Sequence, residues 1–180
     1  MLFTSEQVSN GHPDKICDQI SDAIVTDCLL NDRDSRVAVE CMIKDYDITI
    51  AGEITSSHTP DFKDLTYSVL AGIGLPNIEQ YTVNRLISKQ SPDIALGVDQ
   101  QGAGDQGMMF GYATNETREM LPVPFVLATA ALERLKDSRN PFLLPDAKSQ
   151  VTYDYKRKRI DTFLISTQHS KHASLEDVRE

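Results

Sequence analysis

The sequence predicts an α+β protein built from helices and β-hairpins. Apolar residues recur at helical spacing in three segments, 13–31, 60–72 and 124–136. Two pairs of short segments, 37–44 with 48–54 and 149–155 with 160–166, are typical of β-hairpins. These segments do not follow the regular strand–helix–strand alternation of an α/β protein, which favours the α+β class.

The first predicted helix begins at Pro13, because proline suits the first turn of a helix. Its apolar side chains follow at helical spacing: Ile16, Ile20, Ala23, Ile24 and Leu29. The polar run 31–34 is expected to end it. Strands at 37–44 and 48–54 then form a hairpin through a short turn at 45–47.

A second helix is predicted from Pro60, and it ends near Gly72 and Gly74. Its apolar positions are Phe62, Leu65, Val69 and Leu70. Residues 81–88 alternate like a strand. Residues 89–107 are rich in Gly, Gln, Asp and Pro, which predicts a long functional loop rather than a linker.

The last third of the chain is predicted to contain a strand, a helix and a hairpin. The strand is expected at 108–114, and the helix at 124–136 presents an apolar side. The hairpin 149–166 turns at the basic residues 156–159. Ser174, followed by two acidic residues, resembles a helix N-cap. A helix this short is expected either to fray or to be completed by sequence elsewhere, because nucleation is costly.

Composition excludes several classes of protein. The 180 residues include 18 Lys plus Arg against 27 Asp plus Glu, and a net charge of −9 argues against nucleic acid or anionic membranes as partners. No apolar run reaches membrane-spanning length, and no N-terminal targeting signal is visible. Cys17, Cys28 and Cys41 suggest neither a disulfide framework nor a zinc site. They are expected to be small hydrophobes in a reduced core, which predicts a cytoplasmic location.

The block around His12 is the first candidate site. His12, Asp14 and Lys15 lie at a predicted helix N-terminus, where free N–H groups and the helix dipole favour anions. A phosphate is expected to bind His12 and Lys15, with Asp14 holding the accompanying Mg²⁺. The alternative to a binding site is that these residues belong to a solvated face of the helix, because Asp14, Asp18 and Asp22 repeat every four residues.

Two further polar segments are candidates for ligand binding. The glycine-rich hexapeptide 102–107 allows close approach to a ligand and presents Asp105. It lacks the Lys-Ser/Thr ending of a P-loop. Residues 145–150 are expected to form a polar turn entering a strand, with Lys148 able to reach a phosphate. Taken alone, that segment is more typical of an ordinary surface turn.

Other features do not indicate function. The basic run 156–159 is interpreted as a solvated turn, since the whole chain is acidic. His169 and His172 have i, i+3 spacing, but the sequence indicates no further ligand that would complete a metal site with them. Neither a nucleophile motif nor an internal repeat is visible.

Taken together, these motifs resemble the methionine adenosyltransferase family, the enzymes that make S-adenosylmethionine. The resemblance follows that family's order along nearly the whole chain, in segments 5–6, 11–15, 18–23, 52–55, 89–94, 102–107, 109–116, 145–151 and 166–170. Two features depart from the family pattern. Asn10 stands where an acidic residue is usual, and the segment between Val98 and Gly102 is short.

The resemblance implies a role for each matching residue. The residues expected to bind ATP are Glu6, His12, Asp146, Ala147 and Lys148. Those expected to take part in catalysis are His12, Lys15, Asp105 and Lys148. Glu53 and Gln90 are expected to contact methionine, Asp14 to bind Mg²⁺ and Glu40 to help hold K⁺.

The resemblance also implies an α+β fold of mixed β-sheets with helices on one face, in which residues 1–180 form one incomplete unit. Residues 1–12 with 115–180 correspond to an N-terminal-type domain, 13–90 to a partial central-type domain, and 90–107 to a mobile loop and ligand turn. The implied protein is a subunit of a split, hetero-oligomeric methionine adenosyltransferase that acts on ATP and L-methionine. A complementary subunit would supply the C-terminal half. The alternatives are a non-catalytic ATP-binding or regulatory subunit, or an inactive truncated product.

Overall fold

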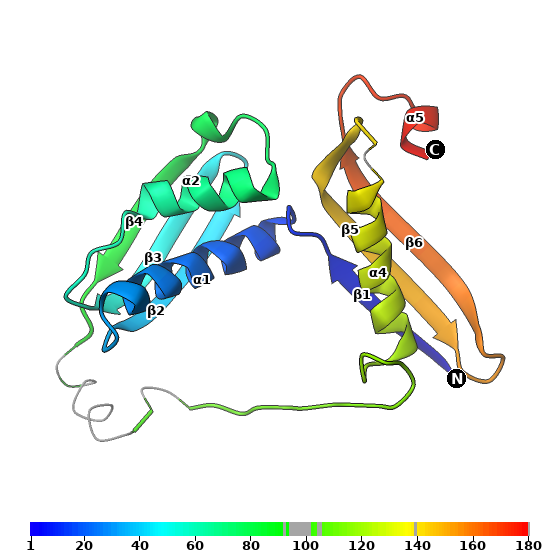
Figure 1. Cartoon of the computed structure of the whole chain (residues 1–180), viewed down its shortest axis with the longest axis horizontal. Helices are drawn as coiled ribbons and strands as arrows, with labels where there is room; N and C mark the ends of the chain where they lie inside the picture. Colours follow the sequence, from blue (N-terminus) through cyan, green and yellow to red (C-terminus); the bar gives the residue numbers. More distant parts are fainter. Residues whose placement is uncertain (92, 94–101, 104–105, 139, 180) are drawn as a thin grey trace. The chain divides into compact units, whose positions relative to one another are not determined.

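The computed structural model of the chain describes residues 1–91, 93, 102–103, 106–138 and 140–179. The chain forms two compact units (Figure 1). Unit 1 comprises Met1–Lys15, Ile73–Leu75 and Gly111–Glu180, and unit 2 comprises Ile16–Gly72 and Pro76–Phe110. Each unit has its own sheet, and the fold is α+β as the sequence predicts.

Unit 2 contains a three-stranded mixed sheet. After α1 (Pro13–Asn31) come the strands β2 (Arg36–Lys44) and β3 (Asp47–Thr55), which form an antiparallel hairpin. Helix α2 (Phe62–Ile73) then leads, through a 3₁₀ turn at Ile78–Gln80, to β4 (Thr82–Ser88), which pairs with β3 in parallel. The order across the sheet is β2-β3-β4. The predicted helices, hairpin and strand of this region are confirmed.

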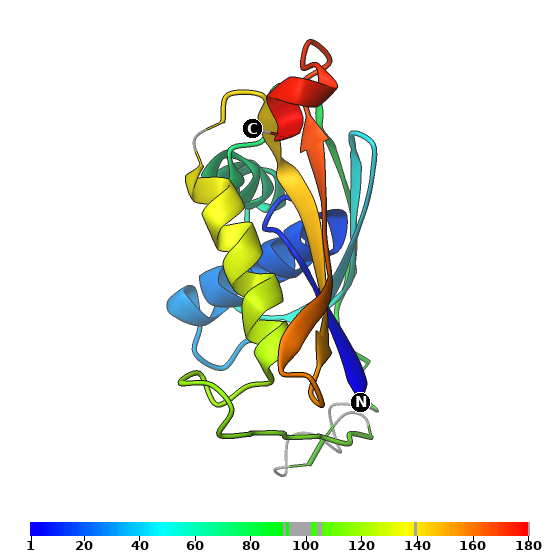
Figure 2. The ribbon, with the colours of Figure 1, turned by 90° about the vertical axis from the view of Figure 1, so that its right-hand side faces the viewer.

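Both helices of unit 2 lie on the same face of its sheet (Figures 1 and 2). Helix α1 buries one side chain per turn, at Ile16, Ile20, Ile24 and Cys28. Helix α2 buries Phe62, Thr66 and Leu70, and β3 buries Ile48, Ile50 and Ile54. This apolar layer is the core of unit 2, since burial of apolar surface is the main favourable term in folding.

Unit 1 contains a three-stranded antiparallel sheet. Its strands are β1 (Leu2–Val8), β5 (Leu143–Asp154) and β6 (Arg159–His169), in the order β1-β5-β6. Helix α4 (Val123–Asp137) lies on one face, against β1 and β5 (Figure 2). Ala147, Ser149 and Val151 of β5 are buried on that face, and Ser149 Oγ donates to the Ala128 carbonyl at 2.7 Å. The predicted helix and hairpin are confirmed.

The strand predicted at 108–114 is wrong. These residues have no regular secondary structure, and Met108, Met109 and Phe110 are exposed. A run of apolar and aromatic residues favours a strand only when a partner strand satisfies its backbone groups.

The polar turn predicted at 145–150 is also wrong, because these residues belong to β5. The pairing of β5 with β6 shifts register between Leu143 and Ala147, so the polar residues occupy an irregular part of a strand. Strand β1 was not predicted. Its partner β5 lies far away in sequence, with Leu2 opposite Asp154 and Val8 opposite Lys148.

The short helix after Ser174 is present as α5 (Leu175–Arg179). Ser174 and Asp177 cap it reciprocally: the Ser174 N–H donates to Asp177 Oδ2 at 2.7 Å, and the Asp177 N–H donates to Ser174 Oγ at 3.2 Å. Asn140 Nδ2 also donates to the Asp177 carbonyl at 2.9 Å. These bonds stabilise a helix too short to form alone. None of the helices in the described part of the chain has the length and apolarity needed to cross a membrane.

Candidate functional site

Ser9 lies two residues before the Gly-His-Pro-Asp-Lys block and is hydrogen-bonded to the start of β5. The Ser9 hydroxyl donates to the Pro145 carbonyl at 2.6 Å and accepts the Ala147 N–H at 2.7 Å. The Ser9 N–H donates to the Ala147 carbonyl at 2.9 Å. Three hydrogen bonds thus join two segments that both belong to the candidate nucleotide site.

Gly11 makes this junction tight. A Cβ at Gly11 would lie 2.5 Å from the carbonyl carbon and Cβ of Pro145, closer than real Cβ contacts. Gly11 is buried, and only glycine allows the turn before α1 to approach β5 this closely.

His12 is held by the first turn of α1. Its side chain is 12 % exposed, and its Nδ1 accepts the Asp14 N–H at 3.2 Å. In this bond Nδ1 is the accepting ring nitrogen, which leaves Nε2 to donate to a ligand. The Asp14 carboxylate lies 3.8 Å from Nδ1 and is 89 % exposed. His12 therefore offers a donor, and Asp14 an accessible carboxylate, at the same helix end.

Alternation along β5 separates its candidate residues. Ala147 is buried towards α4, and Ser9 occupies both of its backbone polar groups. Lys148 is exposed on the opposite face, where it pairs with Val8. Glu6, which pairs with Gln150, is exposed on that same open face. Asp146 is half-buried. Glu6 and Lys148 thus line one face of unit 1, whereas Ala147 can only position the strand.

The candidate residues of unit 2 lie on its own sheet. Glu53 is half-buried in β3, opposite Ser88 at the end of β4. Gln90 follows that end, and its Oε1 accepts from Arg36 at 3.5 Å. The two residues expected to contact methionine therefore lie at the same end of the sheet. Glu40 is exposed in β2, opposite Ala51.

Asp105 lies outside the described residues, as does most of the loop predicted at 90–107. Gly102, Ala103 and Gln106 are described and belong to no helix or strand.

Asp14 and Glu40 carry carboxylate oxygens, which are the ligands that hard cations such as Mg²⁺ prefer. Mg²⁺ is commonly bound by one or two carboxylates together with waters and substrate phosphates, and an exposed Asp14 at a helix N-terminus is compatible with that pattern. Within the described residues, no three His, Cys, Asp or Glu side chains gather to hold a metal. Asp14 and Glu40 would each contribute a single carboxylate, and other ligands would have to complete each site.

Two comparisons with known proteins bear on this arrangement. The family model described as the N-terminal domain of S-adenosylmethionine synthetase matches residues 1–92, and the model of the central domain matches residues 100–180. The chain belongs to the S-adenosylmethionine synthetase family. A solved structure described as an unusual S-adenosylmethionine synthetase from Campylobacter jejuni is 34 % identical, with a TM-score of 0.88.

The chain spans about half the length of this Campylobacter synthetase. The match covers 99 % of the present chain and 51 % of the Campylobacter chain. The family models divide the sequence linearly near residues 92–100, whereas the compact units interleave, with Met1–Lys15 joined to Gly111–Glu180. The assignment of synthetase domain types to 1–12 with 115–180 and to 13–90 stays a prediction.

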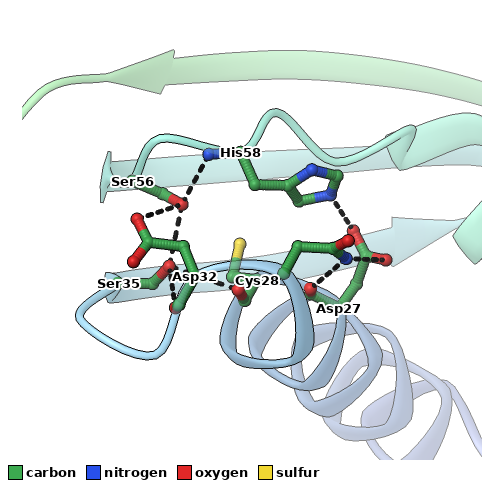
Figure 3. Close-up of polar contacts among 7 residues, drawn as sticks. Asp27, Cys28, Asp32, Ser35, Ser56 and His58 are labelled. Atoms are coloured by element: carbon green, nitrogen blue, oxygen red, sulfur yellow. Dashed lines mark hydrogen bonds and ion pairs between the residues drawn. The ribbon is translucent and has the colours of Figure 1, made fainter.

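One polar cluster of this synthetase-family chain was not predicted from sequence (Figure 3). The His58 ring contacts Asp27 at 2.7 Å, and Asp32 accepts the Ser57 N–H at 2.7 Å and the Ser57 hydroxyl at 2.9 Å. The bonds from Ser57 and Asp34 lower the pKa of Asp32. The cluster, Asp27, Cys28, Asp32, Ser35, Ser56 and His58, fixes the loop after β3 to the C-terminal end of α1. No sequence pattern singles out this cluster, because Ser and Asp are common in loops.

Proposed function

We propose that this chain is one subunit of a split, hetero-oligomeric methionine adenosyltransferase. It forms S-adenosylmethionine from ATP and L-methionine and releases phosphate and pyrophosphate when assembled with a complementary subunit. The observation that supports this most is the junction at Ser9, which joins the His12 block to the Lys148 strand. Family membership and a match to about half of a synthetase chain support the same proposal.

The reaction needs alignment and charge stabilisation more than acid–base chemistry. A lone pair of the methionine sulfur attacks C5′ of ATP, the C5′–O bond breaks, and triphosphate leaves with the bonding electrons. A thioether is a competent neutral nucleophile, so no general base is required. The protein's contribution is to hold the reacting atoms in line and to neutralise the leaving group. Water then hydrolyses the triphosphate.

Unit 1 provides the groups proposed to bind the polyphosphate. His12 Nε2–H, Lys15 and Lys148 bind its oxygens beside the N-terminus of α1, where the helix dipole favours anions. Asp146 and the Ala147 segment orient the nucleotide, and Glu6 and Asp105 are proposed to contribute acidic groups to the site. Asp14 holds Mg²⁺, which when bound neutralises charge on the triphosphate. Glu53 and Gln90 hold methionine, and Glu40 contributes to a K⁺ site.

These cations are too few to act alone. The departing triphosphate bears about four negative charges, and unpaired charge in a closed site is costly. Lys15 and Lys148 offset only part of it, and His12 adds a hydrogen bond rather than a charge, so the complementary subunit supplies further Lys and Arg side chains. The assembled enzyme is proposed to be cytoplasmic.

The test compares this chain, a complementary chain and their mixture for S-adenosylmethionine formation. The complementary chain is the portion of the Campylobacter jejuni synthetase that the present chain does not cover. The mixture is expected to form product in a Mg²⁺-dependent and K⁺-stimulated reaction, and this chain alone to form little. Full activity from the chain alone would overturn the split-site proposal. A complex whose activity is unchanged by replacing Asp14 and Lys148 would establish the regulatory alternative.

A further inference from the structure

Unit 2 contains a pocket of about 390 Å³ between the start of α2 and strand β4. Val83 and Arg85 of β4 line it, and they pair with Ile48 and Ile50, which are completely buried beneath the helices. The pocket therefore lies on the helix side of the sheet. Glu53 faces the opposite side, because it alternates along β3 with the buried positions. The pocket is thus separate from Glu53, which is proposed to contact methionine.

The inner surface of this pocket is apolar. Pro60 is buried, Phe62 is 7 % exposed and Val83 is half-buried, and all three line the pocket. Pockets of this volume with a mainly apolar lining and a few polar groups are typical of small-molecule sites. The apolar part of a ligand would therefore be covered by these three side chains.

Two cations at the pocket are held by aromatic rings. The guanidinium carbon of Arg85 lies 5.6 Å from the centre of the Phe62 ring, and Lys63 Nζ lies 5.3 Å from the centre of the Tyr67 ring. The Tyr67 hydroxyl donates to the Tyr81 carbonyl at 2.9 Å, which fixes that ring. Within the described ranges, neither Lys63 nor Arg85 forms an ion pair with a carboxylate. Both cations are therefore positioned without being neutralised by the chain that surrounds them.

Asp61 determines which groups of the pocket bind an anion. Its Oδ1 accepts the Lys63 N–H at 3.1 Å and the Asp64 N–H at 3.0 Å, so these N–H groups of α2 already have an acceptor. The binding of an anion therefore depends on the side chains of Lys63 and Arg85. With these two cations and the Asp61 carboxylate, the lining carries one net positive charge. That charge matches a carboxylate better than a phosphate monoester, which carries about −1.5 to −2 at neutral pH.

We propose that this pocket binds a small monocarboxylate with an apolar or aromatic body. The carboxylate binds Arg85, whose planar guanidinium suits two parallel hydrogen bonds, and Lys63 adds a second positive charge. The body packs on Pro60, Phe62 and Val83. This site goes beyond the proposed function, since no step of that reaction uses these residues.

The experiment follows the amide chemical shifts of the full chain during titration with phenylacetate. Saturable binding is expected with a dissociation constant of about 1 mM, a reasonable affinity for a ligand of this size. The largest shifts are expected at Lys63, Val83 and Arg85. Phenylacetamide, which keeps the ring without the charge, and acetate, which keeps the charge without the ring, should each bind at least about tenfold more weakly. Phenyl phosphate should also bind more weakly than phenylacetate.

Substitutions at the two cations locate the binding site. Arg85→Gln is expected to weaken phenylacetate binding at least about tenfold, and Lys63→Gln about threefold. Arg33→Gln is the matched control, because Arg33 is exposed in the same unit but does not line the pocket. It should change the affinity less than about twofold. All three side chains are exposed, so melting temperatures should stay near that of the unsubstituted chain.

Four results would overturn this inference. The first is the absence of saturable shifts at about ten times the expected dissociation constant. The second is a set of shifts centred on His12 and Lys148, which would place the anion at the proposed phosphate site. The third is an effect of Arg33→Gln as large as that of Arg85→Gln, which would indicate a general effect of charge. The fourth is tighter binding of phenyl phosphate than of phenylacetate, which would contradict the assignment of a carboxylate.

Discussion

Gly11 lies directly against Pro145, so that a Cβ at residue 11 would meet the Pro145 carbonyl carbon and Cβ at 2.5 Å. The atoms it would meet are mostly backbone, which cannot rotate aside as the end of a long side chain can. The size of residue 11 therefore sets how closely the turn before α1 approaches β5.

We expect Gly11→Ala to destabilise the protein by about 1–3 kcal/mol, because the added methyl group forces the turn away from β5. It should also weaken ATP binding, since the same shift separates the His12 block from Lys148. Thermal unfolding followed by circular dichroism, together with calorimetric titration of ATP, checks both effects.

Gly72→Ala is the matched control. Gly72 lies in α2, and a Cβ there would meet no atom within 4 Å. Alanine is a better helix former than glycine, so stability should stay equal or rise by up to about 1 kcal/mol. Equal losses from the two substitutions would contradict the close-approach explanation.

Ser9→Ala tests the hydrogen bonds of the same junction. It removes the donor to the Pro145 carbonyl and leaves the Ala147 N–H, in a residue that is 4 % exposed, without an acceptor. We expect a loss of about 1–3 kcal/mol in the free energy of unfolding, measured by urea denaturation. Thr4→Ala, which breaks an exposed bond to Thr152, should cost less than about 0.5 kcal/mol.

Lys148→Ala should reduce turnover of the assembled enzyme at least about tenfold, or roughly 1.4 kcal/mol, with little change in melting temperature. Lys148 is exposed in β5, so its removal takes away a phosphate-binding cation without disturbing the core. Lys156→Ala, in the turn between β5 and β6, should leave turnover unchanged. The assay is S-adenosylmethionine formation by the mixed subunits. Normal turnover with Lys148→Ala would remove this residue from the site.

Asp32→Asn should make stability depend less on pH. The hydrogen bonds from Ser57 lower the pKa of Asp32 in the folded protein. Its ionised form therefore contributes stability that is present above the pKa of an aspartate in the unfolded chain. That contribution is lost as pH falls through the lower pKa of the folded protein.

The melting temperatures of the two proteins should thus differ most near neutral pH and converge as the solution is acidified. Asp34→Asn removes a charge of the same sign from an exposed neighbour and should change the melting temperature less. A difference between Asp32→Asn and the unsubstituted protein that stays constant down to acidic pH would refute the role given to the ionised carboxylate.

The sequence by itself determined the elements whose signals are local. Helix α1 follows from Pro13 and from apolar residues one turn apart, and the structure buries Ile16, Ile20 and Ile24. The β2–β3 hairpin follows from two alternating segments and a short turn, in which Asp45 has a positive φ of 54°. The residue types of the candidate site were also visible, because His12, Asp14 and Lys15 are adjacent in the chain.

Only the tertiary structure decided which distant segments pair. Strand β1 forms because Leu2–Val8 finds β5, and the same pairing turns the polar segment 145–148 into a strand that Ser9 holds beside His12. Residues 108–114 have stronger local strand character yet form none. A strand is stabilised by hydrogen bonds to a partner, and the partner's position is not encoded in the strand's own residues.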